Sequence, residues 1–147
     1  MGTVKEGKVA KILIIDDDPR MRRTVSRILA GVGHEVIEAR DGLEGVDLFR
    51  SNQPDIVITD IIMPGKEGIE TILDLRREHP STTLILAISG GATNPLGSPV
   101  PVDYLGLAKG LGADRVLAKP FRSADLLREI DNLLRPGARG TGGPDAQ

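Results

Sequence analysis

The sequence contains no cysteine and only three aromatic residues in 147, which are Phe49, Tyr104 and Phe121. Without cysteine, the chain forms no disulfide, offers no thiolate nucleophile and binds no zinc through sulfur. No apolar run approaches the roughly 18 residues that a transmembrane helix needs, and the first residues lack the apolar core of a secretion signal. These absences predict a cytoplasmic protein without a membrane partner.

Positive charge is not in excess either, because 19 Lys and Arg residues stand against 21 Asp and Glu residues. DNA binding usually comes with a basic excess or patch, so we expect no DNA partner. The length suits one domain. Glycine and proline gather in residues 90–112 and 136–147. We therefore predict a folded domain over 10–135, with flexible tails over 1–9 and 136–147.

Five short runs rich in Ile, Val and Leu predict strands that are buried on both faces. They span residues 11–15, 35–39, 55–60, 82–89 and 115–118. Helical patterns of apolar residues follow each run, over 21–32, 43–49, 69–75, 104–111 and 126–134. The alternation predicts an α/β fold, a doubly wound (βα)5 three-layer sandwich around a parallel five-stranded sheet.

Local signals mark several helix ends. Gly31 and Gly33 are expected to end the first helix. Asp41 and Glu44 match a capping box at the start of the second, and Ser123 is expected to cap the last.

Polar side chains follow four of the five predicted strands. Asp16, Asp17 and Asp18 follow the first strand, and Asp60, Ser89 and Lys119 follow the third, fourth and fifth. Ligands bind at the carboxyl ends of strands in open parallel sheets, so these groups are expected to converge. Neighbouring carboxylates repel one another unless a cation such as Mg²⁺ joins them. A carboxylate is also a nucleophile for phosphoryl transfer, and lysine, hydroxyl and metal can stabilise the charge on the transferring group.

Four segments carry a resemblance to a known family: KILIIDDDPRMRR, DIVITDIIMPGKEG, LAISGG and GADRVLAKPF. Together they resemble the receiver domain of two-component response regulators, over about residues 11–134. The resemblance implies a flavodoxin-like strand order 2-1-3-4-5 and a stand-alone receiver domain over 10–135. It also implies a phosphoprotein that accepts its phosphoryl group from a histidine kinase or a histidine phosphotransfer protein and signals to a downstream protein target.

The resemblance also implies a role for each site residue. Asp60 would be the phosphoacceptor, with Ser89 and Lys119 contacting the phosphoryl group. Asp17, Asp60 and the backbone carbonyl of Ile62 would ligate Mg²⁺ (or Mn²⁺), and Asp16 would hold it through water. The Lys119-Pro120 peptide bond is expected to be cis.

Two features depart from the family pattern. The position three residues before Lys119 usually holds an aromatic switch residue that moves together with Ser89, and here it is Val116. Residues 90–102 form a longer Gly- and Pro-rich segment, for which we expect a loop without regular structure that serves as an output surface. Only 13 residues follow Leu134, too few for an output domain, so the signal is expected to leave through the domain's own surface, as a monomer or a homodimer.

Two alternative functions remain. A phosphorylation-independent binding module with this fold is compatible with Val116. A haloacid-dehalogenase-type phosphatase would use Asp16 and Asp18, yet Pro19 and Arg20 stand where its motif continues differently. The non-enzyme signalling role is therefore preferred. His34 and His79 are interpreted as solvated. The segment 20–23 is either part of the face that docks the phosphodonor, as the resemblance implies, or a solvated charged face.

Overall fold

The computed structural model describes residues 9–61, 67–78, 83–89, 92–93, 99–100, 106, 109–110 and 112–135. The predicted tails over 1–9 and 136–147 lie outside this part apart from Val9, as do Ile62, His79 and Tyr104. Of the helix expected over 104–111, only Gly106, Lys109 and Gly110 are described, and all three are helical. None of the described helices is both long enough and apolar enough to span a bilayer.

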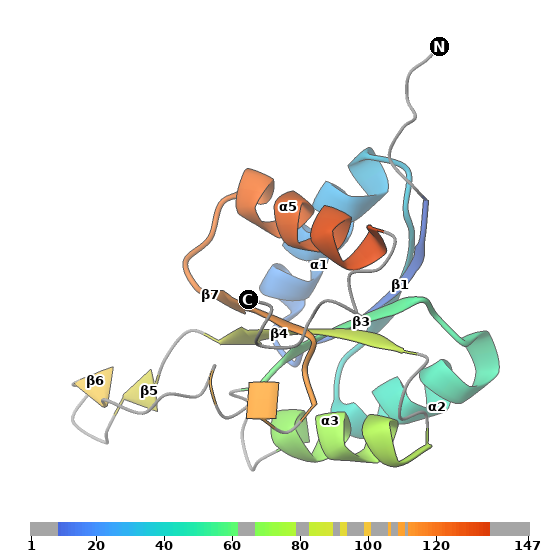
Figure 1. Ribbon diagram of the computed structural model, residues 1–147, viewed down its shortest axis with the longest axis vertical. Coiled ribbons are helices and arrows are strands. Elements are labelled where there is room, and N and C mark those ends of the chain that lie inside the picture. Colours follow the sequence, from blue (N-terminus) through green and yellow to red (C-terminus); the bar gives the residue numbers. More distant parts are fainter. Residues whose placement is uncertain are drawn as a thin grey trace.

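A parallel sheet of five strands in the order β2-β1-β3-β4-β7 forms the centre of the molecule (Figure 1). Its strands are β1 (Lys11–Ile15), β2 (Glu35–Ala39), β3 (Ile56–Asp60), β4 (Leu84–Ser89) and β7 (Arg115–Ala118). The predicted order 2-1-3-4-5 is confirmed, since β7 is the fifth strand of the sheet. The β1 and β7 ranges equal the predicted ones, whereas β4 begins two residues later than predicted.

Helices cover both faces of this sheet (Figure 1). They are α1 (Pro19–Gly31), α2 (Gly42–Asn52), α3 (Glu67–Glu78) and α5 (Ser123–Leu134). α1 and α5 pack on one face and α2 and α3 on the other. Alternate residues of each buried strand enter the two cores, so that Ile12 and Ile14 of β1 lie under α1 and α5 while Leu13 and Ile15 lie under α2 and α3. The three-layer prediction is confirmed.

The helix ends differ from the predictions in their details. Asp18 caps α1 by accepting a hydrogen bond from the Arg20 N–H at 2.9 Å. Val32, predicted on the buried face of α1, lies beyond its last residue and is 53 % exposed. Ser123 is not the cap of α5: Arg122 holds that position, and its N–H donates to the Asp125 carboxylate at 2.9 Å. The Asp125 carboxylate in the first turn, and not the expected Ser123 hydroxyl, therefore accepts a hydrogen bond at the start of this helix.

The capping prediction at Asp41 is confirmed in part. Its carboxylate accepts the Glu44 N–H at 2.8 Å, but the Glu44 carboxylate accepts the N–H of Arg40 and not that of Asp41.

Residues 90–102 contain regular structure, contrary to prediction. β5 (Ala92–Thr93) and β6 (Pro99–Val100) form a second, antiparallel sheet of two strands. Pro99 removes a backbone donor but is tolerated in so short and peripheral a ladder. The two strands project from the main sheet on the side of β4 and β7 (Figure 1).

His34 is a second correction, because it is not solvated. It is 8 % exposed, and its Nδ1 accepts the Ala10 N–H at 3.1 Å. Burial lowers the pKa of this histidine, while the nearby charge of Asp131 acts in the opposite direction. The neutral imidazole therefore accepts a hydrogen bond from the backbone N–H just before β1. A buried N–H at this position needs such an acceptor, because it lies outside the strand pairs of the sheet.

Candidate functional site

The acidic residues meet at the carboxyl edge of the sheet, where β1, β3, β4 and β7 end. Asp16 directly follows β1, and Asp60 is the last residue of β3, which pairs with both β1 and β4. Both aspartates are buried, at 5 % and 6 % exposed, whereas Asp17 is exposed. Two carboxylates in a nearly solvent-free position need compensation from a cation or from hydrogen bonds.

Lys119 supplies one such cation. Its Nζ donates to Oδ2 of Asp60 at 2.6 Å, across a sequence separation of 59 residues. The lysine stands just after β7, and its N–H donates to the Ser89 carbonyl at 2.8 Å. This backbone bond ties the end of β4 to the residue that contacts Asp60. The following Lys119-Pro120 bond is cis, as predicted.

Asp16 carries the clearest electrostatic signature of the site. Burial raises the pKa of its carboxyl from an ordinary 3.8 to about 6. The hydrogen bond that Oδ1 accepts from the Asp18 N–H, at 2.9 Å, opposes this shift, and the negative charge of Asp60 adds to it. A raised carboxyl pKa inside a cluster of acids is typical of a site that binds a cation or handles a charged substrate.

Ser89 completes the cluster at the end of β4. It is 3 % exposed and neighbours Ala118 of β7 in the sheet register. Val116 lies two residues earlier on β7, is half-buried, and packs against the core under α2 and α3. A valine there fills space in the core and presents no ring that could rotate between two positions.

The donor set fits Mg²⁺ in its chemistry. Hard divalent cations take oxygen ligands, and Mg²⁺ commonly uses one or two carboxylates with water and phosphate oxygens. Within the part of the chain that the structure describes, no three His, Cys, Asp or Glu side chains form a complete metal cage. The carbonyl of Ile62, the remaining predicted ligand, lies outside the described residues.

Gly68 is a site residue whose role we did not predict from the sequence. A Cβ atom at this position would lie 2.3 Å from the Asp60 carbonyl oxygen and 2.5 Å from the Cα of Ile61. Only glycine therefore lets the first turn of α3 pack against the backbone that carries Asp60. The segment DIVITDIIMPGKEG, which carries part of the family resemblance, ends at this glycine, but its spacing alone does not reveal the close approach.

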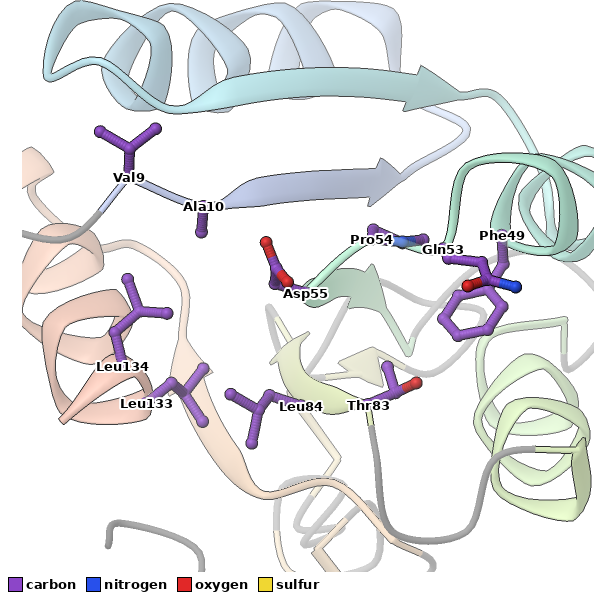
Figure 2. Close-up of a pocket in the computed structure, with 10 residues that line it drawn as sticks. All are labelled: Val9, Ala10, Phe49, Gln53, Pro54, Asp55, Thr83, Leu84, Leu133 and Leu134. Carbon is purple, nitrogen blue, oxygen red and sulfur yellow. The ribbon is translucent and has the colours of Figure 1, made fainter. Parts of the chain in front are cut away.

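A pocket of about 680 Å³ lies at the opposite, amino edge of the sheet. Figure 2 shows the Asp55 carboxylate between the chain at Ala10 and the leucine side chains of α5 and β4. Asp55 Oδ2 accepts the Lys11 N–H at 2.8 Å. The lining residues are Val9, Ala10, Phe49, Gln53, Pro54, Asp55, Thr83, Leu84, Leu133 and Leu134. This pocket contains none of the predicted site residues.

We compared the chain with known protein families to identify the class that has this fold and this acidic edge. The model of the response regulator receiver domain matches residues 12–131, and the chain belongs to this family. Aspartate phosphorylation and Mg²⁺ binding are typical of its members.

Individual relatives agree with this assignment. The transcriptional regulatory protein CpxR of Escherichia coli (strain K12) is 34% identical over 125 residues, which are 85% of this chain and 49% of CpxR. The response regulator MprA of Mycobacterium sp. (strain KMS) is 31% identical over 125 residues, which are 85% of this chain and 50% of MprA. The chain thus spans about half the length of the curated relatives it matches.

Solved structures show the same fold. A response regulator receiver domain protein from Clostridium thermocellum superposes with a TM-score of 0.73 at 30% identity, covering 86% of this chain and 94% of that one. The chemotaxis protein CheY4 of Vibrio cholerae gives 0.72 at 30% identity, with 86% of this chain and 100% of CheY4 covered.

Proposed function

We propose that this chain is a phosphorylation-controlled signalling domain that accepts a phosphoryl group on Asp60. The observation that carries the proposal is the 2.6 Å contact between Lys119 Nζ and Asp60 Oδ2, in a buried acidic edge shared with Asp16. The carboxylate can act as the nucleophile, and the lysine places a positive charge beside it where the phosphoryl group would arrive. The same ammonium group can then contact an oxygen of the incoming phosphoryl group.

The proposed reaction moves one phosphoryl group between two proteins. An oxygen of the Asp60 carboxylate attacks the phosphorus of a phosphohistidine, forming a P–O bond as the P–N bond breaks. The histidine nitrogen of the donor keeps the electron pair and takes a proton. The donor is a histidine kinase or a histidine phosphotransfer protein, by analogy with the family. The product is an aspartyl phosphate, and its hydrolysis returns the carboxylate and inorganic phosphate.

A metal ion is part of the proposed site. Asp17, Asp60 and the Ile62 carbonyl would hold Mg²⁺ or Mn²⁺, with Asp16 acting through water. When bound, the ion neutralises charge on the carboxylates and the phosphoryl oxygens. The raised pKa of Asp16 supports its inclusion, because burial disfavours the charged form of this carboxylate and a nearby cation would offset that cost.

Ser89 is the proposed sensor of the phosphoryl group, since its hydroxyl can donate to a phosphoryl oxygen. In the family an aromatic side chain at the position of Val116 moves together with this serine. Val116 has no ring, so this chain would transmit the signal through a different conformational change. We propose that the segment of residues 90–102, which leaves β4 directly after Ser89, forms this output surface toward a downstream protein in the cytoplasm. CheY4 of Vibrio cholerae, which the alignment covers over its full length, supports signalling through such a domain alone.

Phosphorylation by acetyl phosphate tests the proposal. The wild-type chain is expected to incorporate one phosphoryl group in the presence of Mg²⁺ and none with EDTA. Asp60→Asn abolishes labelling, whereas Asp55→Asn, at the other end of the same strand, leaves it unchanged. Labelling that survives Asp60→Asn but is lost in Asp16→Asn would instead indicate a phosphatase of the haloacid-dehalogenase type.

One further candidate function has an observation in its favour. With Val116, the chain lacks the aromatic side chain of the family's usual switch. This absence is compatible with a binding module whose affinity for its partner does not depend on phosphorylation. Beryllofluoride, which mimics the phosphoryl group on an aspartate, distinguishes the two. The signalling proposal requires that amide exchange around residues 83–118 changes on beryllofluoride binding, while equal exchange with and without it favours the module.

A further inference from the structure

α2 and α3 lie on the face of the sheet away from α1 and α5 (Figure 1), and a groove lies between them. α2 presents two stripes. Gly42, Gly45 and Phe49 are buried toward the sheet. Leu43, Val46, Asp47 and Arg50, spaced three and four residues apart, turn to the other side. With Gly42 they form one wall of a pocket of about 240 Å³, and the other wall consists of Glu70, Thr71 and Asp74 of α3.

The apolar side chain at the edge of this groove is exposed to solvent. Leu43 is 78 % exposed, the largest value among the large apolar side chains of the described residues. Leu73 of α3, adjacent to the groove, is 38 % exposed. An exposed leucine on a helix, beside a half-buried valine in a concave surface, is the feature that a partner's apolar side chain covers in a protein complex.

Acidic residues outnumber basic ones on the two helices around this leucine, and Arg77 pairs with Asp74 at 3.0 Å. α2 and α3 together carry six acidic and three basic residues. Arg76 is turned away from the groove toward Asp114, and Arg50 is held by Glu78, through Nε to Oε1 at 3.1 Å and Nη2 to Oε2 at 2.5 Å. Asp47 has only a loose contact of 3.8 Å with Arg50, and Glu70 forms no ion pair within the described part of the chain.

The Arg50–Glu78 pair also fixes the shape of the groove. It joins the last turn of α2 to the last residue of α3, so the two walls are linked at one end before any partner arrives. A bidentate pair of this kind restricts the relative movement of the helices. A preformed groove lowers the ordering cost of binding.

We propose that this groove is a docking site for a basic, amphipathic segment of a protein partner. An apolar side chain of the segment would cover Leu43 and Val46, and its lysine or arginine side chains would pair with Asp47 and Glu70. This proposal does not depend on phosphorylation of Asp60, because its groove contains no residue of the acidic edge.

A second copy of the chain fits this groove less well than a different protein. α1 contains four arginines and no acidic residue, so it could supply the basic charge. However, α1 lies on the opposite face of the sheet from α2 and α3 (Figure 1). A contact that joins opposite faces of two identical copies is heterologous, that is, head to tail. Repeated contacts of this kind form open filaments unless the rotation between copies closes a ring. A different protein that carries the basic segment avoids this outcome.

The test uses a synthetic helical peptide of leucine and lysine with its leucines on one face. Its control is a peptide of identical composition whose leucines are dispersed. We expect the first peptide to shift backbone amide signals of residues 42–50 and 70–74, and to bind more tightly than the control. Leu43→Ser and Glu70→Lys are each expected to weaken binding about fivefold or more, because each removes one central element of the contact.

Matched variants keep this test specific. Val32→Ser changes an exposed apolar residue elsewhere, and Glu35→Lys reverses an exposed acidic charge on β2. Both should leave the affinity unchanged, and all four variants should retain the wild-type melting temperature. Equal weakening by groove and control variants, or signal shifts outside α2 and α3, would overturn the proposal. Concentration-dependent self-association in sedimentation velocity that Glu70→Lys abolishes would also overturn it, in favour of a second copy.

Discussion

Asp16 shows how a single buried carboxyl links stability to function. Its raised pKa means that the folded chain binds this proton more tightly than the unfolded chain does. The resulting stabilisation is present below pH 4 and is lost as the pH rises toward 6. Above pH 6 the ionised carboxylate is a cost to folding, which the proposed metal ion would offset.

Asp16→Asn is therefore expected to stabilise the metal-free chain at pH 7.5, by roughly 2–3 kcal/mol for a shift of about two pKa units. The same substitution should reduce the increase in melting temperature that Mg²⁺ produces. Thermal unfolding in EDTA and in Mg²⁺, from pH 4 to pH 8, measures both effects. Asp17→Asn is the control, since Asp17 is exposed and its removal should change metal-free stability by less than about 0.5 kcal/mol. Equal metal-free stability of Asp16→Asn and wild type at pH 7.5 would contradict the account.

Gly68 gives a prediction about packing. Gly68→Ala places a methyl group 2.3 Å from the Asp60 carbonyl oxygen, so the backbone of β3 or α3 must move. We expect a loss of about 1–3 kcal/mol in the free energy of unfolding, as for overpacked sites, together with slower phosphorylation of Asp60. Gly31→Ala is the matched control, because a Cβ there meets nothing within 4 Å and the change should be neutral or slightly stabilising. Chemical denaturation of both variants decides, and equal stability would show that α3 accommodates the methyl group.

Arg76 joins three elements at the scale of secondary structure. From α3 its guanidinium donates to the Gly112 carbonyl at 2.8 Å, the Thr83 carbonyl at 2.6 Å and the Asp114 carboxylate at 2.6 Å. Asp114 in turn accepts the Ile85 N–H at 2.8 Å. The arginine thus fixes α3 to the start of β4 and to the segment that enters β7.

Arg76→Met is expected to destabilise the chain by about 3–5 kcal/mol, because Asp114 and two carbonyls lose the hydrogen bonds that the guanidinium donates. Arg77→Met, one residue later, removes only an exposed pair with Asp74 at 3.0 Å and should cost less than about 1 kcal/mol. Urea denaturation measures the difference between the variants. Similar losses for both would mean that the contacts of Arg76 contribute little.

The elements themselves were predictable where the signal is local. The parallel strands are short apolar runs, and the ranges of β1, β2 and β7 follow directly from them. The prediction that every strand is buried on both faces is wrong for the edge strands β2 and β7, which are only partly buried. Contacts between distant segments were not predictable. His34 is buried because Ala10, 24 residues away, needs an acceptor. Similarly, the β5–β6 pairing depends on two dipeptides, and no alternation of apolar residues marks so short a ladder.

The candidate site was predictable because it follows from topology. Once five parallel strands are inferred, their carboxyl ends must share an edge, and the polar residues that follow them must meet there. The contact of Lys119 with Asp60 agrees with this reasoning. The burial of Asp16 and the close approach at Gly68 depend on side-chain and backbone packing, which spacing in a sequence does not specify.

At the scale of the whole molecule, the functional surfaces are separated. The acidic edge lies at the carboxyl ends of the strands, the pocket around Asp55 lies at the amino ends, and the acidic groove lies between α2 and α3. The arginines of α1 are on the other side of the sheet. α1 carries four arginines and no acidic residue, whereas α2 and α3 on the opposite face carry six acidic and three basic residues. Partners of opposite charge can therefore bind to different faces without competing for one surface.

The central claim is that Asp60 receives the phosphoryl group, and mapping the modified residue tests it most directly. Borohydride reduces an aspartyl phosphate to homoserine, which peptide mass spectrometry locates. After treatment with acetyl phosphate, Mg²⁺ and borohydride, we predict homoserine at position 60 alone. Conversion at Asp16 or Asp17 in place of Asp60, or no conversion at any aspartate, would contradict the account.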